Sequence, residues 1–527
     1  MRQYQTFELS YRIENPKNTE PDVNLYGEFV HTETGKAVRV KGFDSGNGCY
    51  KIRFLPELAG EYRWMVRGMA EDAGCEYCAA AEKRHGIVKA EGIHFQYEDG
   101  TFYYPFGTTV YAFAYQNRER IEETFRTLKE APFNKIRMCV FPKYLVYNQE
   151  DPEMFPFEKE GDHWNYHRPC YLFWDHLEAM IRKLDEMEIQ VDLILFHPYD
   201  RWGFARMDKE ACMIYLGYVV RRLAAYPNVW WSLANEYDTM PHFKLEWWSE
   251  FAAYLTKEDS YGHLLSNHNC LVYWDFHNEN TTHCCIQDAN VQMVPDYLEE
   301  YQKPVIFDEC CYEGNVPYNW GNISGFELVH RFWTAVVCGG YCTHGETFLS
   351  EDEVLWWSKG GRLKGESAPR IGFLRELCES FGRPLEFLPD QDSQIPALQR
   401  LKKHPEAVTD VSEGFTRGLV MYPMERVQSF IDDSRKLQGH CGEDVYLLYF
   451  GKHCQAVAEI DLPENKDYRV EVIDIWEMTR QVVKERAFGR TVVELPGKEG
   501  VAVLAISHPF INEMMKMEIS EYEKTGI

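Results

Sequence analysis

The stretch "VWWSLANEYD", Val229 to Asp238, begins with mostly aromatic and aliphatic residues and ends with polar ones. Its first six residues are typical of a buried strand, and Asn235 and Glu236 follow directly. In a barrel of parallel strands, polar residues that follow a strand lie at the carboxyl end, where active sites form. The stretch therefore predicts one strand of such a barrel and a candidate site at its end.

Further short apolar stretches occur on both sides of this strand, separated by helical segments such as "RERIEETFRTLKEA" and "KEACMIYLGYVVRRLAAY". The predicted strands span residues 106–111, 135–141, 190–196, 229–234, 264–267, 284–287, 305–307 and 340–343. Strands that alternate with helices in this number predict an α/β fold, a (β/α)8 TIM barrel. A doubly wound sheet is the structural alternative, but no glycine-rich phosphate turn follows the first strand.

The barrel is flanked by regions of alternating polar and apolar residues. Runs such as "NLYGEFVH" and "EYRWMV" predict an N-terminal β-sandwich, followed by a polar stretch, "EDAGCEYCAAAEKRHG". Runs such as "VYLLYFG" and "GVAVLAI" predict a C-terminal antiparallel β-domain. We therefore expect three domains, at residues 1–88, 89–384 and 385–527.

Charge and composition restrict the partners. A formal net charge of −27 would repel nucleic acid phosphates and anionic membranes. The first residues contain no apolar signal region, and no apolar segment is long enough to cross a membrane. The 16 cysteines, many of them in apolar runs, are typical of reduced thiols. We expect a cytoplasmic protein that binds neither nucleic acid nor membranes.

Nearly every predicted strand delivers a polar or aromatic group to the same face of the barrel. Two of these groups are carboxylates, Glu236 after the fourth strand and Glu309 after the seventh. Glycosidic bond cleavage requires such a pair, one to protonate the departing oxygen and one to attack the anomeric carbon or activate water. The other groups at strand ends are Tyr111, Arg137, His197, Asn235, His268, Gln287, Asp308, His344 and Glu346.

The residues around the two glutamates resemble clan A of the retaining glycoside hydrolases. "SLANEYD" is similar to the clan's Asn-Glu pair after strand four, and "KPVIFDECCYEGN" to its glutamate after strand seven. "GFDSGNGCYKIRFLPELAGEYRW" and "YYPFGTTVYAFAYQ" resemble the sandwich and first barrel strand of the apiosidase-like family. The resemblance implies a retaining, exo-acting glycoside hydrolase that releases a terminal sugar from small glycosides or oligosaccharides.

The resemblance also implies roles for individual residues. Glu236 would be the acid/base and Glu309 the nucleophile, with Arg137 beneath it to keep it ionised. Asp308 is the rival nucleophile, but neighbours on a strand point in opposite directions, and the motif favours Glu309. The predicted substrate-binding residues are Arg137, His197, Asn235, His268, Gln287, His344 and Glu346. Clan members often have a tyrosine after strand six and a tryptophan after strand eight, where this chain has Gln287 and His344 with Glu346.

Other interpretations remain open. Arg137 could be a structural ion-pair residue, and the histidines could be core or rim residues. The protein could be an inactive barrel that binds a glycan through aromatic loops bearing Trp202, Trp274 or Trp320. A metal-dependent barrel hydrolase is a further alternative, but no H-x-H motif occurs, and Cys75-x-x-Cys78 lacks a second ligand pair. We expect no metal and no cofactor, and terminal β-domains that brace the barrel or form a homo-oligomer interface.

Overall fold

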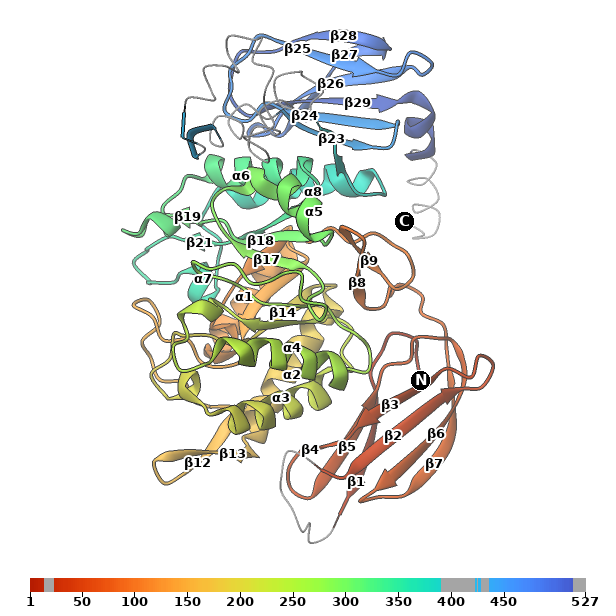
Figure 1. Cartoon of the computed structure of the whole chain (residues 1–527), viewed down its shortest axis with the longest axis vertical. Helices are drawn as coiled ribbons and strands as arrows, with labels where there is room; N and C mark the ends of the chain where they lie inside the picture. Colours follow the sequence, from red (N-terminus) through yellow and green to blue (C-terminus); the bar gives the residue numbers. More distant parts are fainter. Residues whose placement is uncertain (14–22, 390–421, 424, 428–435, 515–527) are drawn as a thin grey trace. The chain divides into compact units, whose positions relative to one another are not determined.

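The computed structural model describes residues 1–13, 23–389, 422–423, 425–427 and 436–514 (Figure 1). It divides into two compact units. The first comprises Met1–Ala289, Tyr301–Ser324 and Cys342–Ala368, and the second Asn290–Glu300, Gly325–Tyr341 and Pro369–Ile527. None of the helices in the described ranges has the length and apolarity that crossing a membrane requires.

Eight strands form one parallel, nearly closed barrel sheet in the order β16-β15-β14-β11-β10-β20-β18-β17. The strands are β10 (Gly107–Thr109), β11 (Lys135–Cys139), β14 (Gln190–Phe196), β15 (Val229–Ala234), β16 (Leu265–Ser266), β17 (Cys284–Gln287), β18 (Val305–Glu309) and β20 (Tyr341–His344). Between the two end strands, the Ser266 hydroxyl donates to the His283 carbonyl at 2.6 Å. The predicted TIM barrel is confirmed, although its first strand is shorter than the expected 106–111.

Helices form at the four helical stretches that the sequence predicts, as α1 to α4, and side-chain caps begin two of these four. Asn117 accepts the Arg120 N–H before α1, and Asp208 accepts the Ala211 N–H before α3. The α-helices are α1 (Arg118–Glu130), α2 (Tyr171–Glu186), α3 (Lys209–Leu223), α4 (Leu245–Glu258), α5 (Val294–Tyr301), α6 (Gly325–Val337), α7 (Trp356–Lys359) and α8 (Ser367–Ser380). Short 3-10 turns span Phe113–Tyr115, Phe204–Arg206, Tyr237–Thr239, Val291–Met293 and Asn319–Gly321.

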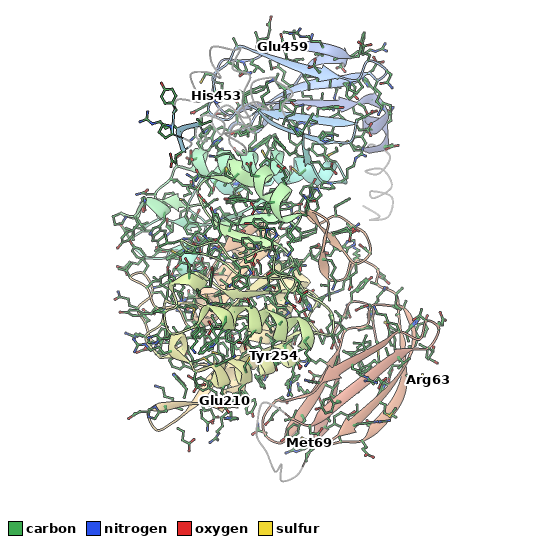
Figure 2. All side chains as sticks on the ribbon, in the orientation of Figure 1. Arg63, Met69, Glu210, Tyr254, His453 and Glu459 are labelled. Atoms are coloured by element: carbon green, nitrogen blue, oxygen red, sulfur yellow. The ribbon has the colours of Figure 1, made fainter. Side chains whose placement is uncertain are left out.

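The N-terminal region forms two antiparallel sheets, β1-β5-β4 and β3-β2-β6-β7. Phe29 of β2 stacks on Phe54 of β5 with ring centroids 4.2 Å apart, whereas Arg63 of β6 is exposed (Figure 2). The strands are β1 (Phe7–Arg12), β2 (Leu25–His31), β3 (Ala37–Lys41), β4 (Phe43–Asp44), β5 (Cys49–Phe54), β6 (Gly60–Gly68) and β7 (Asp72–Cys78), before a hairpin of β8 (Val88–Glu91) and β9 (His94–Tyr97). Strand β7, within the polar stretch that follows the predicted sandwich strands, pairs with β6 and was not among the predicted strands.

The C-terminal region is antiparallel, as predicted, with a six-stranded sheet in the order β22-β23-β24-β29-β26-β27 and a separate pair, β25 with β28. Val470 and Val503 lie in its buried core. The strands are β22 (Glu386–Phe387), β23 (Leu437–Cys441), β24 (Val445–Tyr449), β25 (Val457–Leu462), β26 (Tyr468–Asp474), β27 (Thr479–Ala487), β28 (Gly489–Glu494) and β29 (Val501–Ser507). Residues 390–421 of the predicted third domain lie outside the described residues, and the three domain boundaries stay predictions.

Two small strand pairs complete the first unit. The antiparallel hairpin of β12 (Phe157–Glu160) and β13 (His163–Pro169) precedes α2. The parallel pair of β19 (Glu313–Gly314) and β21 (Glu346–Thr347) follows the barrel strands β18 and β20. This second pair sets Glu313 directly opposite Glu346.

Candidate active site

Three of the predicted residues meet at the carboxyl ends of β15, β17 and β18. Glu236 lies two residues after the end of β15, Gln287 ends β17 and Glu309 ends β18. With its amide nitrogen turned towards the carboxylates, Gln287 donates to Glu236 Oε1 and to Glu309 Oε2, at 3.2 Å each. The structure therefore joins the two glutamates through one side chain.

Glu309 is held by groups from three other strands. Arg137 Nη1 of β11 lies 3.5 Å from Glu309 Oε1, and His268 Nε2 lies 4.0 Å from the same oxygen. The Tyr111 hydroxyl, after β10, is also within hydrogen-bond distance of Glu309 Oε1. Tyr111 stands among the strand-end residues in the sequence, but it was not predicted to be part of the site. It brings a phenol from the end of strand one to the side of Glu309.

Glu236 lies in a buried environment. The Tyr199 hydroxyl donates to Glu236 Oε2, and the glutamate is only 7% exposed. Burial raises the pKa of Glu236 above its ordinary value, and the nearby Glu309 raises it further. Glu236 can therefore keep a proton at a pH where an exposed carboxyl loses it. Tyr199 follows His197 by two residues in a loop, where no periodicity in the sequence marks it as part of the site.

Asn235 and His197 have different surroundings. Asn235 Oδ1 lies 2.8 Å from the Tyr111 hydroxyl and accepts a hydrogen bond from Arg137 Nη2 at 3.4 Å, whereas its Nδ2 has no partner among the described residues. His197 Nε2 lies 3.1 Å from the Phe141 carbonyl, and burial lowers its pKa to about 3. His197 is therefore a neutral imidazole, and the side-chain amide nitrogen of Asn235 is free to donate.

A buried charge network lies beneath Glu309 inside the barrel. Lys135 Nζ lies 2.5 Å from Asp308 and 3.1 Å from Asp192, and Arg137 Nε lies 3.5 Å from Asp192. Burial alone would raise the pKa of Asp308, but Lys135 and Arg137 hold it well below its ordinary value. Asp308 and Glu309 thus point in different directions, and Asp308 is occupied by the two cations.

Aromatic rings line up beside Tyr111. The rings of Tyr111 and Trp357 have centroids 5.7 Å apart, and Trp357 lies 5.1 Å from Trp320. Tyr318 stacks in parallel on Trp320 at 5.6 Å. Trp357 comes from α7, after strand eight of the barrel, so an aromatic residue from this region is present although His344 and Glu346 follow the strand directly. Trp274, in contrast, packs against Tyr237.

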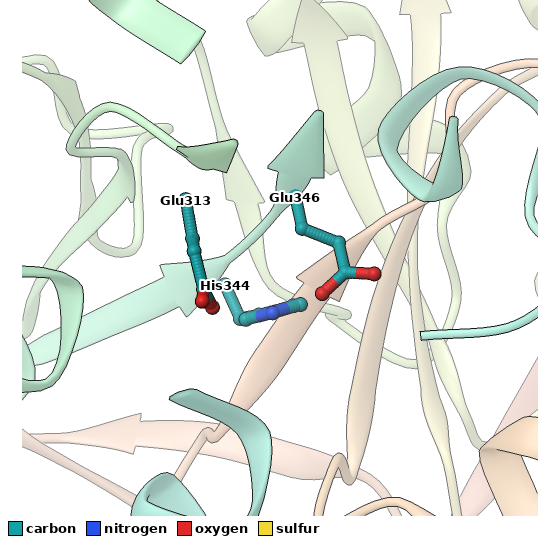
Figure 3. A group of neighbouring side chains, drawn as sticks. All are labelled: Glu313, His344 and Glu346. Atoms are coloured by element: carbon teal, nitrogen blue, oxygen red, sulfur yellow. The ribbon is translucent and has the colours of Figure 1, made fainter. Parts of the chain in front are cut away.

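His344, Glu346 and Glu313 form a second cluster, in which one ligand atom of each residue lies within 4.8 Å of the others (Figure 3). Glu346 accepts the backbone N–H groups of Lys364 and Gly365, at 2.5 and 2.9 Å. The carboxylate of Glu313 likewise accepts the N–H groups of residues 366 and 367, at 2.8 and 3.1 Å. These amides supply the positive charge that a cation would bring, so the cluster fits a loop anchor better than a metal site.

The remaining contacts of this cluster separate it from the two glutamates. His344 Nδ1 lies 2.9 Å from Thr108 Oγ1, and its ring stacks on Phe133 with centroids 4.6 Å apart. Its neighbour Thr343 points the other way and donates to Asp308 at 2.6 Å. No contact of His344 or Glu346 with Glu236 or Glu309 occurs among the described residues. A role for His344 and Glu346 in substrate binding stays a prediction.

Asp238, the last polar residue of the opening stretch, anchors a loop. Its carboxylate accepts the backbone N–H groups of Cys270, Leu271 and Val272, at 2.6, 2.7 and 2.8 Å. The carboxylate thereby fixes the loop that follows His268.

The comparisons with known proteins agree with this geometry. The family model of the apiosidase-like catalytic domain matches residues 89–381, more than half of the chain. The chain belongs to the apiosidase-like family. Two families described as domains of unknown function match the flanks of this apiosidase-like barrel, at residues 1–68 and 435–505. Among curated proteins, none matches the chain.

Solved structures support the same fold. A crystal structure from Bacteroides vulgatus ATCC 8482, provisionally classed as a glycoside hydrolase, is 32% identical with a TM-score of 0.82, and covers 96% of this chain and 99% of that one. A family 5 glycoside hydrolase from the same organism is 15% identical with a TM-score of 0.58, and covers 80% and 94%. The barrel of this apiosidase-like chain therefore has a glycoside hydrolase fold of the clan A type.

Proposed function

We propose that the protein is a retaining, exo-acting glycoside hydrolase. Glu236 acts as the acid/base and Glu309 as the nucleophile. The observation that carries the proposal is the pairing of these two carboxylates through Gln287, at the carboxyl ends of barrel strands. The family membership and the similar glycoside hydrolase structure support the same reaction class.

The two glutamates have environments suited to different tasks. Glu309 lies beside the Arg137 guanidinium and is the carboxylate that we assign to attack on the anomeric carbon. Glu236 has a raised pKa and can protonate the departing glycosidic oxygen. In the second step, Glu236 takes a proton from water, and the water displaces Glu309 from the sugar. The free Nδ2 of Asn235 is available to the sugar 2-hydroxyl.

The spacing of the two carboxylates is compatible with retention of configuration. One amide nitrogen lies 3.2 Å from an oxygen of each carboxylate, so these two oxygens are separated by no more than twice that distance. Carboxyl groups are about 5 to 5.5 Å apart in retaining enzymes and about 6.5 to 9.5 Å apart in inverting ones, which need room for a water. This upper bound lies just below the inverting range and is compatible with direct attack by Glu309.

Burial of the pair favours action at a chain end. Glu236 is 7% exposed, and the side chain of Glu309 is 12% exposed. Carboxylates with so little access suit a pocket for a terminal sugar of a small glycoside or oligosaccharide better than an open groove. Rapid release of internal fragments from a polysaccharide would contradict the exo-acting part of the proposal.

The proposal is tested with a panel of chromogenic aryl glycosides and matched Glu→Gln variants. We expect Glu309→Gln and Glu236→Gln each to lower kcat/KM by about 10³-fold or more on the best substrate. Glu210→Gln, at an exposed position of α3 (Figure 2), serves as the control and should behave as the unaltered protein. Proton NMR of the first product should show the anomeric configuration of the substrate.

The outcomes separate the alternatives. An inverted first product would reject Glu309 as a nucleophile while keeping the hydrolase class. Binding of a glycan without turnover of any glycoside would favour the inactive, glycan-binding barrel. Full activity of Glu309→Gln would reject the assignment of the pair.

A further inference from the structure

Lys143, in the loop after β11, is a buried cation without an anionic partner. It is 2% exposed, and it forms no ion pair in the part of the chain that the structure describes. Its surroundings are aromatic. Lys143 Nζ lies 3.2 Å from the ring centroid of Tyr111, 4.3 Å from that of Tyr199 and 5.5 Å from that of Trp357. Three aromatic rings therefore surround the ammonium and can stabilise its charge through cation–π contacts.

The two nearest rings belong to the tyrosines that hold the glutamates. Tyr111 contacts Glu309, and Tyr199 donates to Glu236. One ammonium thus contacts the faces of both phenols whose hydroxyl groups orient the carboxylates. This arrangement links Lys143 to both glutamates, although it contacts neither directly.

The charged groups around the site include both glutamates and two further cations, Lys135 and Arg137. Lys135 and Arg137 lie beside Asp192 and Asp308 inside the barrel, so two cations face two anions there. The groups that face Lys143 electrostatically are Cys139, Arg137, Glu309, Glu236, His197 and His268. Burial lowers the pKa of both histidines, which are neutral, and raises that of the Cys139 thiol. Arg137 already lies beside Glu309, so Lys143 adds a further positive charge near both glutamates. Burial lowers the pKa of Lys143 itself, whereas Cys139, Glu309 and Glu236 raise it.

We propose that Lys143 is a positioning residue that fixes Tyr111 and Tyr199 through its cation–π contacts and supplies the positive charge that eases ionisation of Glu236. The inference rests on the proposed function, because it assigns Lys143 to the reaction of Glu236 and Glu309. During glycosylation, Glu236 gives its proton to the leaving group and becomes negative, and Lys143 stabilises that charge.

Replacement of Lys143 therefore has a predictable effect on Glu236. Burial and Glu309 raise the pKa of Glu236, whereas Lys143 lowers it. Without the ammonium, the ionised form is less stable, so the pKa of Glu236 rises in Lys143→Met. Because Glu236 must be protonated to act as the acid, the alkaline limb of the pH profile of kcat/KM moves to higher pH. The maximum value of kcat/KM falls by about tenfold. Lys143→Arg keeps the charge and should return the limb towards its original position.

The test titrates Glu236 directly, by carbon NMR of protein labelled at the glutamate carboxyl carbon, with the Glu236 signal assigned by its loss in Glu236→Gln. We expect a higher pKa in Lys143→Met and in Lys143→Gln, and a value near the original in Lys143→Arg. Lys159→Met is the matched control, because Lys159 lies 4.7 Å from the Trp164 ring centroid on an exposed hairpin. Either neutral variant gives the readout if the other does not fold.

An unchanged pKa of Glu236 in a folded neutral variant would overturn the inference. So would an equal loss of kcat/KM at every pH, with the alkaline limb of the pH profile unchanged. The titration needs no substrate. A protein that turns over no glycoside would therefore reject the proposed function, while the titration still decides whether Lys143 controls Glu236.

Discussion

At the scale of single residues, the backbone of Glu236 is unusual. Its φ and ψ angles are 57° and 54°, in the left-handed region that few residues other than glycine adopt. Such conformations cost about 1 to 3 kcal/mol and persist where the surrounding structure fixes them. Tyr199 and Gln287 hold the side chain, and Asp238 fixes the adjoining loop. The strain is therefore retained at the residue to which we assign proton transfer.

The Tyr111 hydroxyl offers a direct test of the residues around Glu309. Its single proton can go to Glu309 or to Asn235, and Tyr111→Phe removes it from both. Hydrogen bonds to charged groups contribute about 1.5 to 3 kcal/mol, so we expect kcat/KM to fall by about 10 to 100-fold. Steady-state kinetics on an aryl glycoside measure this. Tyr77→Phe, on an exposed part of β7, is the control, and equal kcat/KM for both variants would contradict the role of Tyr111.

At the scale of elements, the pair β19 and β21 fixes the segment that follows α7. Glu313 and Glu346 accept four successive backbone N–H groups, those of residues 364 to 367. Gly365 lies against both carboxylates, and a Cβ there would overlap an oxygen of each. The two glutamates therefore require glycine at this position. The anchored residues lie shortly after α7, the helix that carries Trp357 beside Tyr111.

This anchor predicts a pH dependence of stability. Burial raises the pKa of Glu346 to about 7 from its ordinary value of 4.5. The folded state keeps the proton where the unfolded state releases it, so the free energy of unfolding falls as pH rises from about 4.5 to about 7. The fall amounts to about 3 kcal/mol. Urea unfolding over this range should show the slope in the unaltered protein and lose it in Glu346→Gln.

The control for this measurement is Glu351→Gln, at an exposed position of the same region. It should keep the slope of the unaltered protein. A constant offset between Glu346→Gln and the unaltered protein at every pH would show that Glu346 does not titrate in this window.

At the scale of the whole molecule, a buried ion cluster joins the N-terminal sheets to the barrel within the first unit. Glu178 of α2 accepts two hydrogen bonds from Arg53 of β5, at 2.5 and 2.9 Å, and one from Arg222 of α3 at 2.5 Å. Arg53 also donates to the Arg222 carbonyl at 2.7 Å. The predicted sandwich and barrel domains are thus connected by charges that water does not reach.

Removal of the central carboxylate should destabilise this connection. Glu178→Gln removes the carboxylate that the two buried guanidinium groups share and leaves them only the more exposed Glu8 and Asp175. We therefore expect the free energy of unfolding to fall by about 3 kcal/mol, the lower end of the cost of breaking a buried ion pair. Arg53 and Arg222 lower the pKa of Glu178 although burial opposes them, so the difference from the unaltered protein should shrink at acid pH. Denaturant unfolding measures both effects. Glu122→Gln, which breaks an exposed pair with Lys183, should change stability little, and an equal change in both variants would contradict the prediction.

Much of the fold could be predicted because short runs of apolar residues correspond to buried strands. All eight barrel strands were located, since each is a short apolar stretch between helices. Strand β7 was not predicted, because nearly all of its residues are at least partly exposed. Its sequence therefore shows no alternation of polar and apolar residues. The two-residue strands β19 and β21 carry no sequence pattern, and their pairing depends on contacts distant in the chain.

The site could be predicted only where a strand end marks it. Glu236, Glu309, Asn235, Arg137 and Gln287 were found this way, and the structure brings them together. Tyr199 and Lys143 lie in loops after strands. In such loops neither periodicity nor position in the sequence marks the residues that contact the site. Their positions follow from tertiary packing.

The bridge that Gln287 makes between Glu236 and Glu309 has a consequence for inhibition. This amide already donates to both carboxylates, so a neutral sugar that enters between them must displace an internal hydrogen bond and gains little in return. A compound with a positive charge at the anomeric position gains attraction from carboxylates on both sides. On the proposed function, released sugar should therefore inhibit weakly, and cationic sugar mimics strongly, which lets turnover continue as product accumulates.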